Sequence, residues 1–313
     1  MQSAIIQPAR GTVKPRPREA PGRWLPAPTL ALQRLYHWSV ALLGTRLYVG
    51  LDASSVIAAA LGEGLGGRSV RAFARVPLEP GALAPSPSGP NLQRADEVRG
   101  AVRRAAEGLG RRATLVLPDG VARVALVEVP DGADPRDYVL FRLAASLPFP
   151  AAEAIVDALA AGGRRAVGAA VRRATVAEYE QAAAAAGLEV ERVHLAPLVA
   201  LAGLMRAGAR DAVHAVLGDV AMCLAAFRGG VPFAVRSRWR DRSSGEASRL
   251  RREAARAAAL AGDGKEPARL VVSGAEATRL RQELGESAGL ALSGLADWPE
   301  AGEPPSWLGG LVS

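Results

Sequence analysis

The sequence predicts an α/β protein of two lobes, because one order of strands and turns occurs twice in the chain of 313 residues. The first copy spans residues 47–76 and the second spans residues 212–238. Each copy reads as an apolar strand, a tight turn of small residues, a second apolar strand, a glycine-rich turn and a third strand. Two such units, far apart in a chain with room for a sizeable core, predict a two-lobed body.

The first turn of each copy contains residue types that suit phosphate binding. In a two-lobed clamp of the actin type, each first turn brings its backbone N–H groups close to a nucleotide phosphate, and Gly, Ser and Asp are favoured there. The first copy has Asp52, Ser54 and Ser55 in this turn, and the second has Gly218 and Asp219. The turns therefore retain only some of the residues that a nucleotide clamp needs.

The composition indicates a folded protein and gives little support for nucleic acid binding. Hydrophobic residues make up 49% of the chain, which excludes general disorder. The formal net charge is +8, but residues 1–44 carry six basic side chains against Glu19 alone and contribute +5 of it. The remaining +3 is ordinary for a folded domain, so we expect no nucleic acid partner.

Cysteine and histidine are too few for a disulfide or a zinc site. The single cysteine, Cys223, excludes an intramolecular disulfide, and its apolar strand favours buried packing over a reactive role. The histidines, His37, His194 and His214, are far apart, and no Cys/His spacing is typical of zinc. We therefore expect no metal site of this kind.

Residues 1–44 are interpreted as a basic, Pro-rich extension that is partly disordered. An apolar pattern with Tyr36 and Trp38 leaves three interpretations open: a docked helix, a misassigned start and a segment that lies on a membrane surface. The extension does not resemble a signal peptide, and no apolar run reaches the ~18 residues of a membrane span. The expected location is therefore the cytoplasm.

The segments between and after the two copies alternate between helix and strand patterns. Helices are expected at 94–109, 135–147, 176–186, 197–205 and 245–261, strands at 165–171 and 188–195, and a strand, glycine turn and helix start at 268–280.

Local residues mark the ends of several of these elements. Asp134 is a typical N-cap, and Gly187 is a typical helix end. Two β-rich runs within residues 113–130 flank a Pro-Asp-Gly turn, which predicts a hairpin with Gly120 at positive φ. Trp307 lies in an expected closing helical turn.

Several of these pieces, in this order, resemble the PilM family of type IV pilus assembly proteins. That family is related to the cell-division protein FtsA and to the cytoplasmic part of the type II secretion protein GspL. The matching stretches are residues 49–83, 113–130, 141–157 and 167–204, which include the Leu-Pro-Asp turn and the Pro-Phe-Pro helix end. The resemblance covers about residues 45–313 and leaves the first 44 residues without a counterpart.

The resemblance implies an α/β, two-lobed, actin-like fold (ribonuclease H-like and duplicated) with a subdomain inserted in the first lobe. The first lobe would comprise residues 45–111, 188–211 and 286–313. The inserted subdomain would comprise residues 112–187, and the second lobe residues 212–285.

The resemblance also indicates a degenerate nucleotide site. The family's first turn has Asp-Ile-Gly followed by hydroxyl residues and a Lys, with the Asp orienting a magnesium-bound water. Here Asp52 and Ser55 remain, and Ser54 replaces the Gly or the Gly is deleted. Ile57, Ala58 and Ala59 occupy the region where the Lys is expected. A missing cation leaves phosphate charge unpaired, at a cost of a few kcal/mol.

The second and third turns are eroded as well. The family's Asp-x-Gly aligns with Val216, Leu217 and Gly218, so the Asp is lost and Asp219 is expected to act as a turn residue. In the third turn Gly274 remains, but Ala275 replaces a second glycine. We expect no catalytic residue, and either no cofactor or weak binding of ATP with magnesium.

The function implied by the resemblance is that of a cytoplasmic scaffold at the inner membrane. A groove between the first lobe and the inserted subdomain would take the cytoplasmic N-terminal segment of a PilN-like single-span protein. Leu147 and Phe149 are candidate walls of that groove, with core packing as the alternative. Residues 1–44 could add attraction to an anionic membrane.

Two other functions stay open at this point. One is an active ATPase or kinase of the same fold, and the other is a filament former similar to FtsA, which would involve self-association. The arginines at 249, 252 and 256 line one face of an expected helix and are interpreted as a solvated face.

Overall fold

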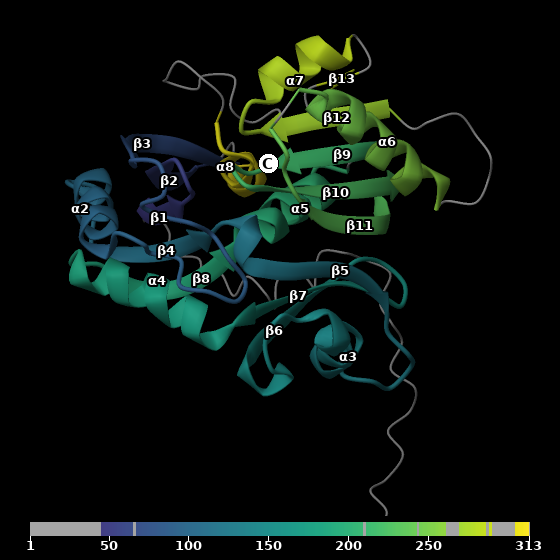
Figure 1. Ribbon diagram of the computed structural model, residues 1–313, viewed down its shortest axis with the longest axis horizontal. Coiled ribbons are helices and arrows are strands. Elements are labelled where there is room, and N and C mark those ends of the chain that lie inside the picture. Colours follow the sequence, from purple (N-terminus) through teal and green to yellow (C-terminus); the bar gives the residue numbers. More distant parts are fainter. Residues whose placement is uncertain are drawn as a thin grey trace, which may run out of the picture.

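The computed structural model describes residues 45–64, 67–208, 211–242, 244–260, 269–285, 288–289 and 304–312. Its strands form two sheets, one of five strands and one of eight (Figure 1). The expectations for residues 1–44, an extension that is partly disordered and that contacts a membrane, lie outside the described residues.

The five-stranded sheet builds the first lobe, in the order β3-β2-β1-β4-β8. Its strands are β1 (Thr45–Leu51), β2 (Ser55–Gly64), β3 (Gly67–Pro77), β4 (Arg112–Leu117) and β8 (Glu189–Leu195). The first three are antiparallel, whereas β4 and β8 run parallel to their neighbours. Parallel strands need long crossovers, and these contain α2 (Ala95–Ala106) and α4 (Arg173–Ala185).

The central strand β1 is buried on both faces of this sheet. Leu47, Val49 and Leu51 pack in a core that includes residues of α2 and α4. Tyr48 points to the opposite face, where it packs in a cluster with residues of α5 (Ala196–Arg206) and α8 (Ser306–Val312). The alternation follows the two-residue period of a strand.

The eight-stranded sheet has the order β13-β12-β9-β10-β11-β5-β7-β6. The second copy of the three-strand unit forms β9 (Ala212–Leu217), β10 (Ala221–Arg228) and β11 (Val231–Trp239), next to β12 (Arg269–Gly274) and β13 (Ala288–Gly289). The helices α6 (Glu246–Ala259) and α7 (Ala277–Leu284) cover one face of these strands and complete the second lobe.

The remaining three strands belong to the inserted segment and continue the sheet of the second lobe. They are β5 (Ala122–Glu128), β6 (Ala154–Ala160) and β7 (Arg165–Arg172), and α3 (Pro135–Leu143) packs on their outer face. The junction is narrow, because Ala125 of β5 pairs with Arg236 of β11. A segment inserted into the first lobe by sequence therefore contacts the second lobe in space.

The boundary expected at residue 112 needs correction. The residues of β4 pair with β1 and β8, so the strand belongs to the first sheet and the inserted segment begins after Leu117. The expected hairpin is also wrong, since β4 and β5 lie in different sheets, joined by a 3-10 turn at Asp119–Val121. Within residues 286–313, β13 pairs with β12 of the second lobe, whereas α8 returns to the first.

The reason for Gly120 also differs from the expectation. Gly120 is not among the positive-φ glycines of the described residues. A Cβ at this position would lie 2.9 Å from Cγ2 of Val220 and 3.2 Å from Cβ of Pro85. Glycine is therefore favoured here by the close approach of neighbouring side chains.

The two lobes share a continuous hydrophobic core. The largest cluster contains residues of β1 and α2, residues of the inserted β5 and β7, and Cys223 and Phe227 of the second lobe. The helices α5 and α8 lie between the two sheets at the centre of Figure 1. They cross closely at Gly203 and Gly310, where a Cβ on either residue would collide with the backbone of the other helix.

Candidate functional site

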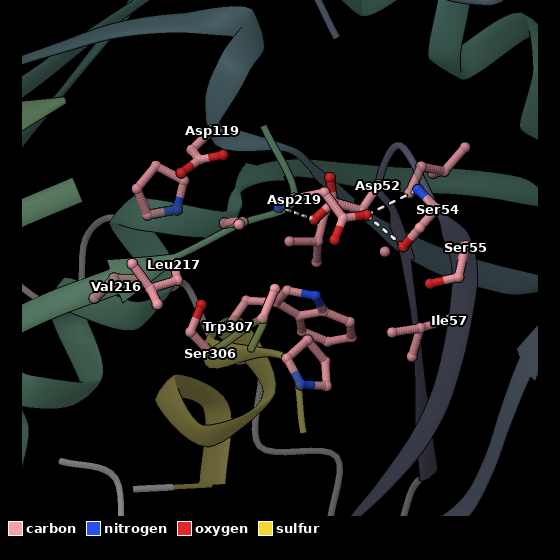
Figure 2. Close-up of a pocket in the computed structure, with 18 of the residues that line it drawn as sticks. Asp52, Ser54, Ser55, Ile57, Asp119, Val216, Leu217, Asp219, Ser306 and Trp307 are labelled. Carbon is pink, nitrogen blue, oxygen red and sulfur yellow. Dashed lines mark hydrogen bonds between the residues drawn. The ribbon is translucent and has the colours of Figure 1, made fainter. Parts of the chain in front are cut away.

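A cleft of about 600 Å³ opens between the two lobes. Its walls come from the turn after β1, the turn after β9, the start of α5, the loop after β12 and the start of α8. Of the residues expected at the site, Asp52, Ser54, Ser55 and Gly218 line this cleft (Figure 2). The fold thus brings the first turns of the two copies together.

The two turns have the same local backbone. The N–H of Asp52 donates to the carbonyl of Ser55 at 2.9 Å, and the N–H of Gly218 donates to the carbonyl of Ala221 at 2.9 Å. The residue after Leu51 in the first copy therefore corresponds to the residue after Leu217 in the second.

This correspondence corrects the alignment expected from the sequence. Gly218, not Val216, occupies the position of Asp52 in the second turn, and Val216 corresponds to Gly50. Asp219 then lies one residue further along its turn, beside the cleft and not on the strand. The second copy therefore has no carboxylate at the position of Asp52.

Gly274 lies next to the cleft and has a backbone role. Its φ is +96°, and a Cβ there would collide with the carbonyl oxygen of Leu217. The next residue, Ala275, donates its N–H to that same carbonyl at 3.0 Å. Ala275 and Glu276, rather than Gly274, line the cleft, and Glu276 has a left-handed φ of 60°.

Hydrogen bonds join the two turns across the cleft. The backbone N–H of Ser54 donates to Oδ2 of Asp219 at 2.8 Å, and the Ser54 hydroxyl donates to the same oxygen. In the opposite direction, the N–H of Asp219 donates to Oδ2 of Asp52 at 3.2 Å. The expected role of Asp219 as a turn residue is therefore incomplete, because its side chain contacts the other lobe (Figure 2).

The cleft is acidic. Four carboxylates, those of Asp52, Asp119, Asp219 and Glu276, line it, and among the lining residues that the structure describes Arg75 is the one basic side chain. Burial raises the pKa of Asp119 to about 7. Burial and the negative charges of Asp219 and Asp119 raise the pKa of Asp52 well above its usual value.

These residues do not fit ATP with magnesium. The Ser54 N–H, which would face a phosphate, already donates to Asp219. A polyphosphate would also compete with Glu276 and Asp219 for Arg240 and Arg242, because these guanidinium groups already pair with the two carboxylates. Among the described residues, no group of three or more His, Cys, Asp or Glu side chains is placed to hold a metal ion.

Arg240 fixes the second-lobe wall of the cleft from behind. Its side chain is fully buried and donates to the carbonyl of Gly218 at 2.6 Å and to the carbonyl of Ala275 at 3.2 Å. It also pairs with Glu246 at 2.8 Å and with Glu276 at 3.1 Å. One guanidinium thus ties together two turns and the start of α6, because its donors form a planar fork.

Trp307 closes the cleft from the C-terminal side. Its indole covers Gly50, where a Cβ would lie 2.6 Å from the ring. The side chain is 6% exposed and packs in the cluster with Tyr48 and Leu308. The sequence predicts a helical turn at Trp307, but no local pattern indicates that the side chain reaches the cleft, because that depends on where α8 returns.

A second hollow, here called the groove, lies between the first lobe and the inserted segment. It has a volume of about 630 Å³, and its apolar lining includes Ile155, Val171, Val193, Leu195 and Leu198. Two edge strands face it: in the described residues, β6 pairs with β7 alone and β8 pairs with β4 alone. Edge strands present unpaired backbone groups that a further strand can use.

The candidate walls Leu147 and Phe149 lie elsewhere. Leu147 packs on the cluster of Val127, Val139 and Leu143 between the inserted strands and α3, and Phe149 is buried. Neither residue is among those that line the groove. Their role is core packing. The α-helix expected to reach residue 147 ends at Leu143, and a 3-10 turn at Ala144–Ser146 follows it.

Charged side chains rim the groove. Arg136 of α3 pairs with Asp157 of β6 at 3.0 Å. Glu180, Glu191 and Arg192 also line it. Burial, with the positive charge of Arg192, lowers the pKa of His194 to about 4, so this imidazole is neutral at physiological pH.

Comparison with known proteins shows the fold. No protein-family model and no curated protein matches the sequence. Among solved structures, the chain is similar to a PilM–PilN type IV pilus biogenesis complex, with 19% identity, a TM-score of 0.61, and coverage of 79% of this chain and 86% of that one.

Two further structures share the architecture. The first is the cytoplasmic domain of EpsL, an inner-membrane component of the type II secretion system of Vibrio cholerae (15% identity, TM-score 0.50, 86% of this chain and 93% of that one). The second is a Bacteroides thetaiotaomicron protein described as having an actin-like ATPase fold and unknown function (9% identity, TM-score 0.51, 77% and 86%). The two-lobed actin-like fold expected from the PilM resemblance is thereby confirmed.

In the described part of the chain, no helix has both the length and the apolar character needed to cross a bilayer.

Proposed function

We propose that this protein is an assembly scaffold of an inner-membrane machine of the type IV pilus or type II secretion kind, and that it binds the cytoplasmic N-terminal segment of a PilN-like protein in the groove. The observation that carries the proposal is the groove itself, an apolar hollow between two sheet edges in a chain of PilM-like fold. The work of the protein is then binding at the cytoplasmic face of the membrane, with residues 1–44 adding positive charge.

The groove suits an extended peptide. A peptide that enters between β6 and β8 can hydrogen-bond to an open strand edge, while alternate side chains enter the apolar lining. Ile155 is 37% exposed, so it is available to a ligand without any rearrangement of the core. Apolar anchors in such a groove supply most of the binding energy.

The acidic cleft favours a scaffold function rather than an ATPase activity. The Ser54 N–H already has an acceptor, and Arg240 and Arg242 already pair with carboxylates of the wall, so both the N–H donor and the cations are less available to a polyphosphate. One observation favours the alternative of ATP binding: Arg75 lines the cleft and pairs in the sheet with Ile57, where the sequence lacks the expected Lys. A cation from a neighbouring strand could meet a phosphate at that place.

The groove proposal is tested by co-expression with a single-span protein encoded beside this gene. Ile155→Glu adds a charge in the groove and is expected to weaken the complex by about tenfold or more, since burying an unpaired charge costs at least 1.4 kcal/mol. The matched control is Phe141→Glu, on α3 of the same inserted segment, because Phe141 is 73% exposed and outside the groove. Both affinities are measured by calorimetry with the partner's N-terminal peptide.

Each outcome of this experiment either supports or contradicts the groove proposal. Weakening by Ile155→Glu alone, and loss of the complex when the partner's N-terminal segment is deleted, support it. Equal affinities for the wild type and Ile155→Glu, or a complex that survives the deletion, contradict it.

Titration with ATP and magnesium separates the scaffold from the enzyme. We expect no heat of binding at micromolar nucleotide. Micromolar affinity that is lost in Asp52→Ala would overturn the scaffold proposal. Self-association, the third possibility, is checked by sedimentation, where a stable monomer at high concentration counts against a filament former.

A further inference from the structure

We infer that Asp219 takes the place of a bound anion: its carboxylate occupies the phosphate position of the first turn and joins the two lobes by hydrogen bonds without a nucleotide. The inference goes beyond the scaffold proposal, because it concerns how this chain holds its closed form. It does not depend on what the groove binds.

The donors that meet Asp219 are those that a phosphate-binding turn offers. The Ser54 N–H donates to Oδ2 at 2.8 Å, and the Ser54 hydroxyl donates to the same oxygen. Backbone N–H groups and hydroxyls of small turn residues are the donors that such turns present to anions. A carboxylate oxygen in this place therefore satisfies them from within the chain.

The carboxylate of Asp219 is also bonded through its second oxygen. Oδ1 of Asp219 accepts from Arg242 at 3.2 Å, and the Asp219 side chain is 11% exposed. Arg242 also lies 3.7 Å from Glu276. Both oxygens of the Asp219 side chain therefore have donors, one from the first lobe and one from the second, and hydrogen bonds of this charge-assisted kind are stronger than neutral ones.

The contact between the turns runs in both directions. The first turn donates from Ser54 to Asp219, and the second turn donates from the N–H of Asp219 to Asp52. Because the partners are 165 and 167 residues apart, these bonds join the lobes and do not merely shape one turn. In an actin-like clamp a nucleotide would bridge the same two turns, and here the bridge is a side chain.

The rest of the second-lobe wall fits this arrangement. Arg240 ties the carbonyl of Gly218, beside Asp219, to the carbonyl of Ala275 and to Glu246. A buried ion pair of this kind fixes geometry strongly, since removing one partner leaves an unpaired charge. Asp219 is thus presented to Ser54 from a turn that is already fixed.

The test is hydrogen exchange by mass spectrometry on the full chain, comparing the wild type with Asp219→Ala. Loss of a hydrogen bond to a charged group costs about 1.5–3 kcal/mol, so the peptide covering residues 52–56 of the first lobe is expected to exchange about tenfold faster or more. The matched control is Asp211→Ala, which removes a carboxylate that accepts the Gly229 N–H at 2.7 Å far from the cleft. It is expected to leave residues 52–56 unchanged.

Two further variants keep the test decisive. Asp219→Asn preserves the size of the side chain and replaces Asp219→Ala in the exchange measurement if Asp219→Ala does not fold. Ser54→Ala removes one donor and is expected to give a smaller effect, which disappears when it is combined with Asp219→Ala. Unchanged exchange of residues 52–56 in the Asp219 variants that fold would overturn the inference. If Ile155→Glu does not weaken binding of the partner, the groove proposal fails, but the exchange expected for residues 52–56 in the Asp219 variants stays the same.

Discussion

At the scale of single residues, two buried polar side chains, Arg240 and His214, differ sharply in their partners. The Arg240 side chain has four acceptors and no exposed surface. His214, in the middle of β9, is 5% exposed, and neither of its ring nitrogens has a hydrogen-bond partner among the described residues. Its ring packs edge-on against Phe227, at a centroid distance of 5.3 Å. The structure accommodates this histidine in its neutral form.

His214 should make the protein sensitive to acid. Burial lowers its pKa from 6.5 to about 4, so the folded state resists protonation and the unfolded state does not. Above pH 6.5 His214 is neutral in both the folded and the unfolded state and adds no pH-dependent cost, and stability is lost as the pH falls from 6.5 towards 4. At pH 5 this loss is about 2 kcal/mol.

The measurement is urea unfolding of the wild type and His214→Leu at pH 7.5 and pH 5.0. Relative to His214→Leu, the wild type is expected to have a free energy of unfolding about 2 kcal/mol lower at pH 5.0 than at pH 7.5. Protonation of His194 contributes equally to both proteins, so it does not affect the difference between their free energies of unfolding. An identical loss of stability in both proteins would show that His214 is not the cause.

At the scale of elements, α8 depends on a close crossing with α5. Gly203 and Gly310 face each other at this crossing, and α8 carries Trp307 onto Gly50 at the cleft. Small residues allow two helix backbones to approach, and any added carbon must push them apart. The position of the cleft wall therefore follows from two glycines that lie outside the cleft.

Gly203→Ala is expected to destabilise the protein by about 1–3 kcal/mol, because its methyl group overpacks the crossing. Residues 304–312 should exchange hydrogen faster in this variant. The control is Gly100→Ala in the middle of α2, where a Cβ would lie 3.4 Å from the flexible Arg104 side chain. That change should stabilise by up to about 1 kcal/mol, as Ala favours a helix over Gly. Equal changes in the free energy of unfolding for Gly203→Ala and Gly100→Ala would contradict a close crossing of α5 and α8 at Gly203.

At the scale of the whole molecule, the inserted segment connects the lobes. Its strands follow β4 of the first lobe, and they continue the sheet of the second lobe through Ala125 and Arg236. The largest core cluster runs through all three parts. Together with the bonds between Ser54, Asp219 and Asp52, these contacts predict one cooperative body and not two freely hinged lobes.

The single cysteine reports on this cooperativity. Cys223 is buried in β10 of the second lobe, and burial raises the pKa of its thiol, so it reacts only after opening. Val139→Ala, in α3 of the inserted segment, removes two methyl groups from a fully buried side chain and should cost about 1–3 kcal/mol. If the body is cooperative, this distant change speeds thiol labelling of Cys223 in urea by about five-fold or more. An unchanged labelling rate in a destabilised variant would indicate separate unfolding of the inserted segment.

Much of the fold could be predicted from the sequence because its signals are local. The repeated three-strand unit gave β1–β3 and β9–β11, and Asp134 does cap α3, accepting the N–H groups of Arg136 and Asp137. The sequence pattern does not predict the strand β6, and it does not separate α3, which ends at Leu143, from the 3-10 turn at Ala144–Ser146 that follows. Turn residues, caps and two-residue alternation act within a few positions and so can be read along the chain.

The sequence by itself thus determined the two-lobed architecture and the residues of the two turns, since both follow from short-range patterns. Only the tertiary structure decided which strand belongs to which sheet, that Gly218 corresponds to Asp52, and that Asp219 reaches Ser54 across the cleft. The sheet assignments depend on strand pairs distant in sequence, such as Leu47 with Ala113 and Ala125 with Arg236, and the bonds across the cleft join residues 165 and 167 positions apart. A pattern within one segment does not contain the position of its distant partner, so only the packed molecule brings the charges and donors of the cleft together.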